Sequence, residues 1–180
     1  FPDPVSSDAN PLFAFTTDEA VSGSVCRLDG LPPIACGSPV TVTELGGQVP
    51  LADGPHQLTV TSTDIAGNVE TASASVSWST DTTIPEIEML EEPPAFTPTG
   101  SVDFGWIVWD GGPTDRELSE EAESECRFDY EQGEVQGEED GWQECGRAFE
   151  ISEEQNSNGG HSFEVRATDQ AGNVSEVMER

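Results

Sequence analysis

The sequence predicts an all-β fold of two tandem Greek-key β-sandwiches, each closed by one local disulfide. The segment DGPHQLTVTSTDIAGNV returns, with few changes, as GGHSFEVRATDQAGNV. Both copies alternate apolar and polar residues with a period of two, which is typical of strands with one buried face. Short strands separated by Asp-Gly, Ala-Gly-Asn and Pro-containing turns favour a sandwich.

The repeat also sets the domain boundaries. Residues Gly54–Val69 match Gly159–Val174 at a fixed offset of 105, without a gap. A period of about 100 residues is the usual size of one all-β module. The segment WSTDTTIPE has the polar, Pro-containing composition of a short linker. We therefore predict two domains, 1–82 and 83–180.

The four cysteines take part in the repeat. CRLDG at Cys26 corresponds to CRFDY at Cys126, and CGSPVTV at Cys36 corresponds to CGRAFEI at Cys145. Four cysteines allow three pairings, and only the local one keeps the two modules equivalent. We expect disulfides Cys26–Cys36 and Cys126–Cys145. The paired short spacings of a zinc site are missing.

Composition limits the partners and the compartment. Thirty-six acidic residues against six arginines and no lysine give a net charge of −30. Such a charge argues against nucleic acid or an anionic membrane as partner. Disulfides indicate an oxidising compartment, and no apolar stretch is long enough to cross a bilayer. We therefore expect a secreted protein that is extracellular or displayed on a cell surface.

Acidic residues are densest in the second module, which carries an acidic insertion at about 112–144. Blocks of like charge are usually solvated surface loops. Clustered carboxylates also supply the six to eight oxygen ligands that Ca²⁺ takes. Both interpretations stay open at this point.

The pattern CRLDG, CGSP, DGPHQLTVTSTDIAGN and DTTIP resembles the bacterial immunoglobulin-like repeats found in tandem in large surface proteins and adhesins. The resemblance covers nearly all of the first module, and Cys126 and Gly159–Val174 in the second. It implies immunoglobulin-like sandwiches that act as spacers or stalks, often stiffened by calcium at module junctions. The acidic insertion departs from the pattern.

The DxAGN motif has two interpretations. Its Gly-Asn pair can take positive φ and close a hairpin, while its aspartate accepts backbone N–H bonds across the turn. Alternatively, the motif contributes calcium ligands: one site would join Asp64, Asn68 and Asp81 at the module junction, and Asp169 and Asn173 would face the next module.

Two residue types bear on activity and recognition. The only histidines, His56 and His161, occupy equivalent strand positions without a nucleophile or ligand set nearby, so we expect scaffold residues and no enzyme. Trp106 aligns with Phe15 and is expected in the core. Trp109 and Trp142 have no counterparts in the first module, and we consider them as core residues, loop anchors or contacts for a glycan or protein.

The two modules differ at their edges. Phe1–Asn10 is a Pro-broken segment where the second module offers Glu86–Leu90 as a first strand, and the second module has a short last strand. Open edges recruit strands from other chains. The sequence thus favours a stalk or spacer segment of a surface adhesin, with neighbouring modules as partners. One alternative is the subunit of a filament that polymerises head to tail by sharing strands with identical subunits; another is a carbohydrate- or protein-binding module.

Overall fold

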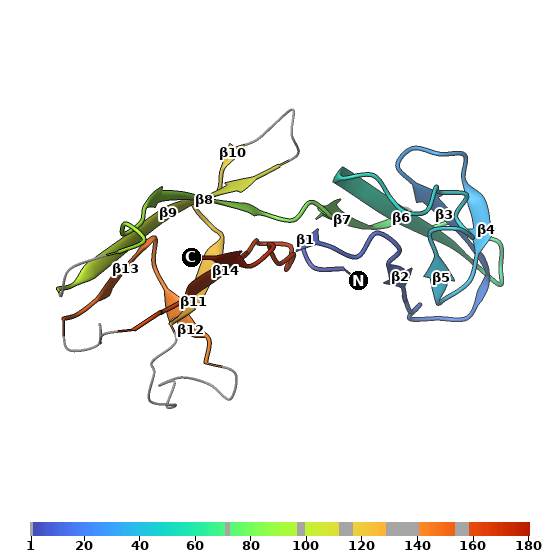
Figure 1. The fold of residues 1–180 in the computed structure, drawn as a ribbon. Coiled ribbons are helices and arrows are strands. Elements are labelled where there is room, and N and C mark those ends of the chain that lie inside the picture. Colours follow the sequence, from blue (N-terminus) through green and yellow to red (C-terminus); the bar gives the residue numbers. More distant parts are fainter. Residues whose placement is uncertain (1, 71–72, 97–99, 112–116, 129–140, 154–158) are drawn as a thin grey trace. The chain divides into compact units, whose positions relative to one another are not determined.

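The computed structural model describes the whole chain except residues 1, 71–72, 97–99, 112–116, 129–140 and 154–158. Much of the acidic insertion therefore lies outside the described residues. The chain divides into two compact units, Phe1–Thr82 and Thr83–Arg180. The described residues form strands, turns and loops, which confirms the all-β fold class, and none of them belongs to a helix that could cross a membrane (Figure 1).

The described residues of the first unit form two sheets. Five strands follow the order β1-β7-β6-β3-β4, and β2 pairs with β5. β1 runs parallel to β7, and the other pairs are antiparallel. The strands are β1 (Val5–Ser6), β2 (Leu12–Phe13), β3 (Val21–Leu28), β4 (Ile34–Cys36), β5 (Val40–Thr41), β6 (Gly54–Asp64) and β7 (Ala74–Thr80).

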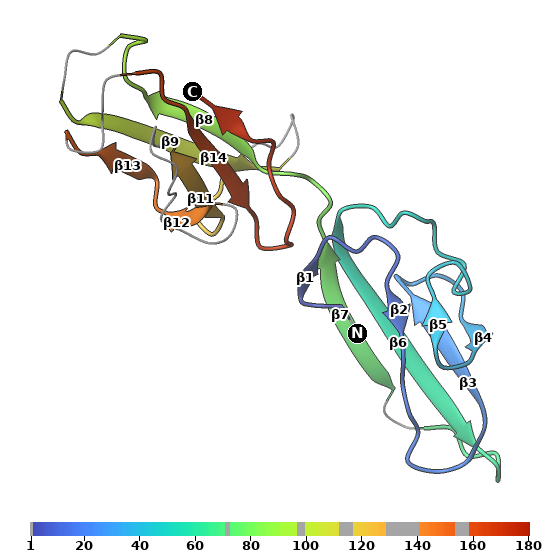
Figure 2. The ribbon, with the colours of Figure 1, turned by 60° about the horizontal axis from the view of Figure 1, so that its bottom comes forward.

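The second unit also has two sheets in its described part. In one sheet, β9 is flanked by β8 on one edge and by β10 and β13 on the other; the second sheet has the order β12-β11-β14-β15. Figure 2 shows these strands from a second direction. Their bounds are β8 (Glu86–Glu91), β9 (Val102–Asp110), β10 (Glu117–Leu118), β11 (Glu123–Phe128), β12 (Gln143–Cys145), β13 (Ala148–Ile151), β14 (Phe163–Thr168) and β15 (Met178–Glu179).

The sequence repeat is also a repeat of strand register. Cys26 lies opposite Val60 across β3 and β6, and Cys126 lies opposite Val165 across β11 and β14. Because side chains alternate between the faces of a strand, this shared register sends equivalent residues of the two units into their cores. The repeat found in the sequence therefore corresponds to one sandwich built twice.

Each unit has a core of its own, filled by the inward-facing residues of its two sheets. In the first, Phe13 and Trp78 meet with ring centroids 5.1 Å apart, and both are almost fully buried. In the second, Phe104 and Phe163 stack at 4.1 Å. Trp106 is 1% exposed and its indole N–H donates to the Ser124 hydroxyl at 3.2 Å, so its predicted core position is confirmed.

The two cysteine pairs have different chemical states. Cys26 and Cys36 form the expected disulfide. Cys126 and Cys145 are thiols in the structure, so the second expected disulfide is not formed there. Their strand register is nevertheless that of the first pair, with Ser124 opposite Cys145 as Ser24 is opposite Cys36. A hydrogen bond toward Cys145, together with burial, raises the pKa of Cys126 far above its ordinary value.

We predict that the Cys126 and Cys145 thiols oxidise to a disulfide when the protein is purified without reductant, because their register already matches that of Cys26 and Cys36. The closed loop should stabilise the second unit by about 3 kcal/mol. Alkylation of the denatured, unreduced protein followed by mass spectrometry should find no modified cysteine. In the Cys126→Ser control, Cys145 should be alkylated. Alkylation of both Cys126 and Cys145 in the unchanged protein would contradict the prediction.

Candidate functional site

The DxAGN motif forms the same closed turn in both units. In the first unit, the Asp64 carboxylate accepts from the Asn68 backbone N–H at 2.8 Å and from its side-chain amide at 2.7 Å. Asp169 and Asn173 make the same two bonds, both at 2.9 Å. Gly67 and Gly172 take positive φ values of 92° and 86°, which glycine adopts without strain.

These bonds account for the chemistry of the motif in the first unit. Both Asp64 oxygens accept hydrogen bonds from Asn68, and this interaction lowers the pKa of Asp64 below its ordinary value. The backbone closes the turn from the other side, since the Asp64 N–H donates to the Asn68 carbonyl at 3.0 Å. The turn interpretation therefore accounts for the hydrogen bonds between Asp64 and Asn68.

The structure places Asp64 and Asp81 at opposite ends of the first unit. Gly54, the first residue of β6, pairs with Thr80, which directly precedes Asp81. Asp64 is the last residue of β6, ten residues further on, or about 33 Å at the usual rise of a strand. Asp64 and Asn68 therefore cannot share an ion with Asp81, and that part of the calcium expectation is wrong.

We call the end of each unit that carries its DxAGN turn the turn end. In the second unit, Glu86 begins β8 and pairs with Trp109, next to Asp110 at the end of β9. A carboxylate oxygen of Asp110 lies within 4.8 Å of one of Asp169. The chain thus enters the second unit at its turn end. Asp169 and Asn173 lie at this same end, and their role toward a following module stays an expectation.

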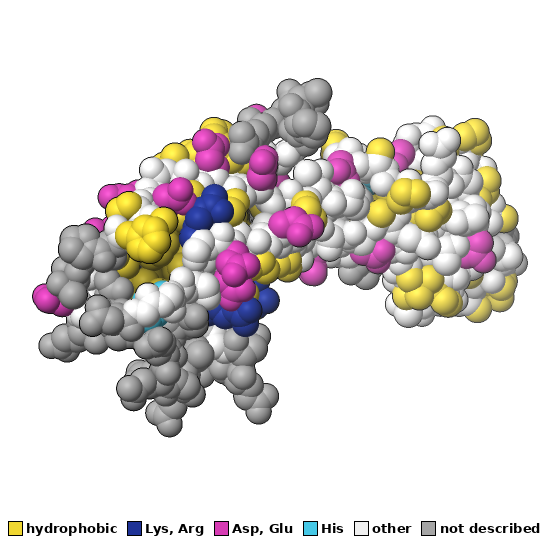
Figure 3. Space-filling model, viewed as in Figure 1, with side chains coloured by type: hydrophobic (Ala, Val, Ile, Leu, Met, Phe, Trp, Pro, Cys, Tyr) yellow, Lys and Arg dark blue, Asp and Glu magenta, His cyan; other side chains and the backbone are white. Residues whose placement is uncertain are grey.

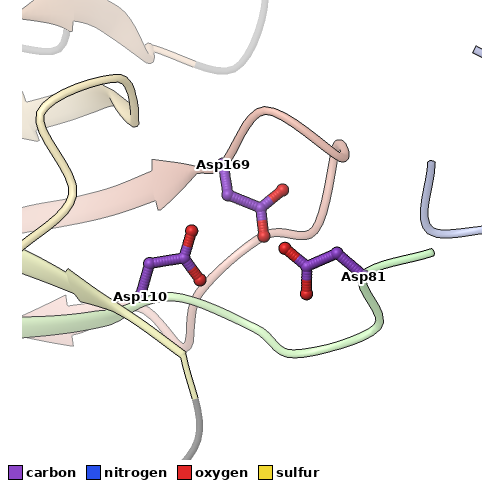
Figure 4. A group of neighbouring side chains, drawn as sticks. All are labelled: Asp81, Asp110 and Asp169. Atoms are coloured by element: carbon purple, nitrogen blue, oxygen red, sulfur yellow. The ribbon is translucent and has the colours of Figure 1, made fainter. Parts of the chain in front are cut away.

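Figure 4 shows the carboxylates of Asp110 and Asp169 directed toward each other. Asp169 is buried, and Asp110 is half-buried. Asp81 is the penultimate residue of the first unit, and its N–H donates to the Ser6 carbonyl at 3.0 Å. The pair Asp110 and Asp169 was not found from the motif, because Asp110 lies outside the repeated segment. The offset of 91 that aligns Trp106 with Phe15 also aligns Asp110 with Glu19, and this shared acidity was the available signal.

The donor atoms of this pair suit a hard divalent cation. Two carboxylates supply at most about four of the six to eight oxygens that Ca²⁺ takes. Both Asp169 oxygens already accept bonds from Asn173, but a carboxylate oxygen keeps a second lone pair for a cation. The residues therefore fit Ca²⁺ in kind, and water or further oxygen ligands would have to complete its shell.

Two arginines lie over the ring of Trp142. Trp142 is 6% exposed, and the guanidinium groups of Arg127 and Arg166 lie 4.8 and 4.3 Å from its ring centroid. Arg127 also pairs with Glu164, and Arg166 with Glu125 at 2.8 Å. Burial and these cation–π contacts favour the interpretation of Trp142 as an anchoring residue, and its contact with a glycan or protein stays an expectation.

Trp109 has a different environment. It is half-buried at the turn end of the second unit, and its indole N–H donates to the Glu88 carboxylate at 2.7 Å, which ties β9 to β8. Figure 3 shows acidic side chains spread over both units, whereas the basic side chains visible on this face belong to the second unit.

His56 is fixed by two acceptors. Nδ1 donates to the Asp29 carboxylate at 2.6 Å, and Nε2 donates to the Ala52 carbonyl at 2.8 Å. Both contacts can be hydrogen bonds at once only when the ring carries two protons, because both partners are acceptors. Burial lowers the pKa of His56, but the bonds to Ala52 and Asp29 and the Asp29 charge raise it by more, so it lies above its ordinary value. An imidazolium held this way is not a general base.

No family model and no curated protein matches the chain. Among solved structures, the chain is similar to the fibronectin(III)-like modules of Clostridium thermocellum CbhA, with 11% identity, 99% of this chain and 87% of that chain covered, and a TM-score of 0.48. It is also similar to a structure of a 1.5-MDa bacterial ice-binding adhesin, with 16% identity, coverage of 98% and 58%, and a TM-score of 0.41.

A third similar structure is a Ca²⁺-stabilised adhesin of an Antarctic bacterium that binds ice, with 15% identity, coverage of 98% and 44%, and a TM-score of 0.36. The chain thus spans about half the length of the two adhesin chains. Because the TM-scores of these three structures are below 0.5, the assignment as two β-sandwiches follows from the chain's own strand topology.

We predict that the contribution of His56 to stability falls as the pH rises. Its folded-state pKa is raised, so the imidazolium contacts are fully present below about pH 6.5 and are lost as the pH passes the folded-state value. The difference in unfolding free energy between the natural chain and His56→Gln should be about 1 kcal/mol at low pH and smaller at high pH. Urea unfolding near about pH 5.5 and about pH 8.5 measures it. A difference that is constant or grows with pH would refute the assignment.

Proposed function

We propose that this protein is a non-enzymatic extracellular structural module, a stalk or spacer segment of a bacterial surface adhesin. The observation that carries the proposal is that one sandwich is built twice in the same register, with a separate core in each unit. A module that completes its own core can be added in series without redesign of its neighbours. Spacer chains need this property.

The disulfide, the net charge and the contacts of His56 support the same proposal. The Cys26–Cys36 disulfide persists in an oxidising compartment such as the exterior of a cell. A net charge of −30 keeps such a chain soluble and discourages association with anionic surfaces. The histidine with resolved hydrogen bonds, His56, is engaged by acceptors and not by a nucleophile.

We further propose a calcium site at the turn end of the second unit. Asp110 and Asp169 bring like charges close together, and a bound cation would remove their repulsion.

The filament subunit is the second candidate, because the first unit has an open edge beside β2, analysed in the next subsection. The third candidate, a glycan-binding module, loses support because Trp142 is buried and two guanidinium groups lie over its ring. Trp109 remains as its only aromatic residue from the sequence analysis.

A stalk segment should stay monomeric at every concentration. We predict that sedimentation velocity gives one species of the mass of a single chain over a wide range of concentration, with and without calcium. Negative-stain electron microscopy should show isolated two-lobed particles. Regular filaments that lengthen with concentration would refute the stalk proposal and support head-to-tail assembly.

Calcium should stabilise the second unit. In millimolar Ca²⁺, its melting temperature should rise by several degrees relative to EDTA, since a ligand that binds only the folded state stabilises it. Asp110→Asn should abolish the rise, because Asp110 makes no bond to the DxAGN turn. Glu19→Gln, the equivalent change in the first unit, is the matched control and should keep it. Identical melting curves in calcium and EDTA would exclude the site.

A further inference from the structure

The two units differ at one edge. In the second unit, β8 pairs along β9, with Met89 opposite Trp106 and Ile87 opposite Val108 (Figure 2). The offset of 91 places the equivalent edge of the first unit at residues 14–18, directly after β2. No described strand pairs with that edge, because the strand that begins the first unit, β1, pairs with β7 instead.

The side chains beside residues 14–18 are more exposed than their counterparts in the second unit. Ile87 of β8 is 6% exposed and packs in the core of the second unit, where Trp106 is 1% and Ala167 is 0% exposed. Their counterparts in the first unit, Phe15 and Ser62, are only half-buried. The described part of the first unit thus leaves open the space that β8 fills in the second.

That space is a groove of about 580 Å³. Its apolar wall includes Phe15, Val21, Val60, Val69 and Ala74. Its rim carries four carboxylates and no basic residue: Asp18, Glu19, Asp64 and Glu70. An apolar wall beneath an acidic rim matches a strand with apolar side chains on one face and basic side chains on the other.

We propose that this groove binds an extended segment of another protein, which adds as a strand along residues 14–18 in the position that β8 occupies in the second unit. The segment carries large apolar residues at alternate positions and basic residues between them. Backbone hydrogen bonds to the open edge hold it, its apolar side chains cover Phe15 and Val60, and its basic side chains face the acidic rim.

Charge separates this partner from a second copy of the same chain. In the second unit, the outward Glu88 of β8 accepts the indole N–H of Trp109. Asp18 is the counterpart of Trp109 and offers a carboxylate in place of a donor. A strand with the acidic sequence of β8 would therefore meet like charge, and a segment with lysine or arginine at those positions would meet opposite charge.

The test uses the full chain and three labelled six-residue peptides with blocked ends, of the length of β8. The first has the β8 sequence EIEMLE, the second is KIKMLK, and the third, KNKNLK, keeps the charge but lacks the apolar face. Fluorescence anisotropy at physiological ionic strength should show KIKMLK bound at least about tenfold more tightly than either of the others. Hydrogen exchange should show new protection at residues 14–18.

Two variants test whether KIKMLK binds in the groove. The double substitution of Asp18→Lys with Glu19→Lys should weaken KIKMLK binding at least about tenfold, because it reverses the charge of the rim. The double substitution of Glu120→Lys with Glu121→Lys, which makes the same change of charge at exposed residues of the second unit, is the matched control and should leave binding unchanged. Circular dichroism should show both variants folded.

Three results would overturn the proposal. No binding of KIKMLK would show that the groove is not a docking site. Equal binding of KNKNLK would reduce the interaction to charge alone. Binding of EIEMLE as tight as that of KIKMLK would point to a second copy of this chain as the partner. It would exclude the requirement for a basic segment of another protein.

Discussion

The pairing of β3 with β6, and of β11 with β14, places the buried cysteines, the DxAGN turns and the arginines beside Trp142. A shift of one residue in either pair would turn each buried side chain toward solvent. The same pairing brings Cys26 opposite Val60 and Cys126 opposite Val165. It also fixes which end of the sandwich carries the DxAGN turn, because the turn follows the last residue of β6 and of β14.

Periodicity and repetition were sufficient to predict the fold class, the Cys26–Cys36 disulfide and the core position of Trp106. They are local or pairwise signals that a single sequence records. The calcium expectation failed at Asp64 and Asp81 for a related reason. A repeat shows which residues are equivalent, but it does not show at which end of a strand the chain enters the next unit. The register of Gly54 with Thr80 decides that point.

The environments of Trp142 and Asp110 were not predicted because they depend on contacts far apart in the sequence. The cations over the Trp142 ring come from β11 and β14, which are paired strands with Glu125 opposite Arg166 and Arg127 opposite Glu164. The spacing of residues in the sequence does not predict these ion pairs between neighbouring strands. Asp110 likewise meets Asp169 only because β9 and β14 end on the same side of the second unit.

The distribution of arginine distinguishes the pair Asp110 and Asp169 from the carboxylates on β11 and β14. Arg127 and Arg166 neutralise the carboxylates that lie directly opposite them on β14 and β11. In the first unit, the positions equivalent to Glu164 and Arg166 are Thr59 and Thr61, so Arg27, the counterpart of Arg127, lies opposite a threonine instead of a carboxylate. Among the described residues, Asp110 and Asp169 form no ion pair with an arginine, and the chain contains no lysine. A divalent cation would supply the positive charge that balances this pair, which is the physical argument for the proposed calcium site.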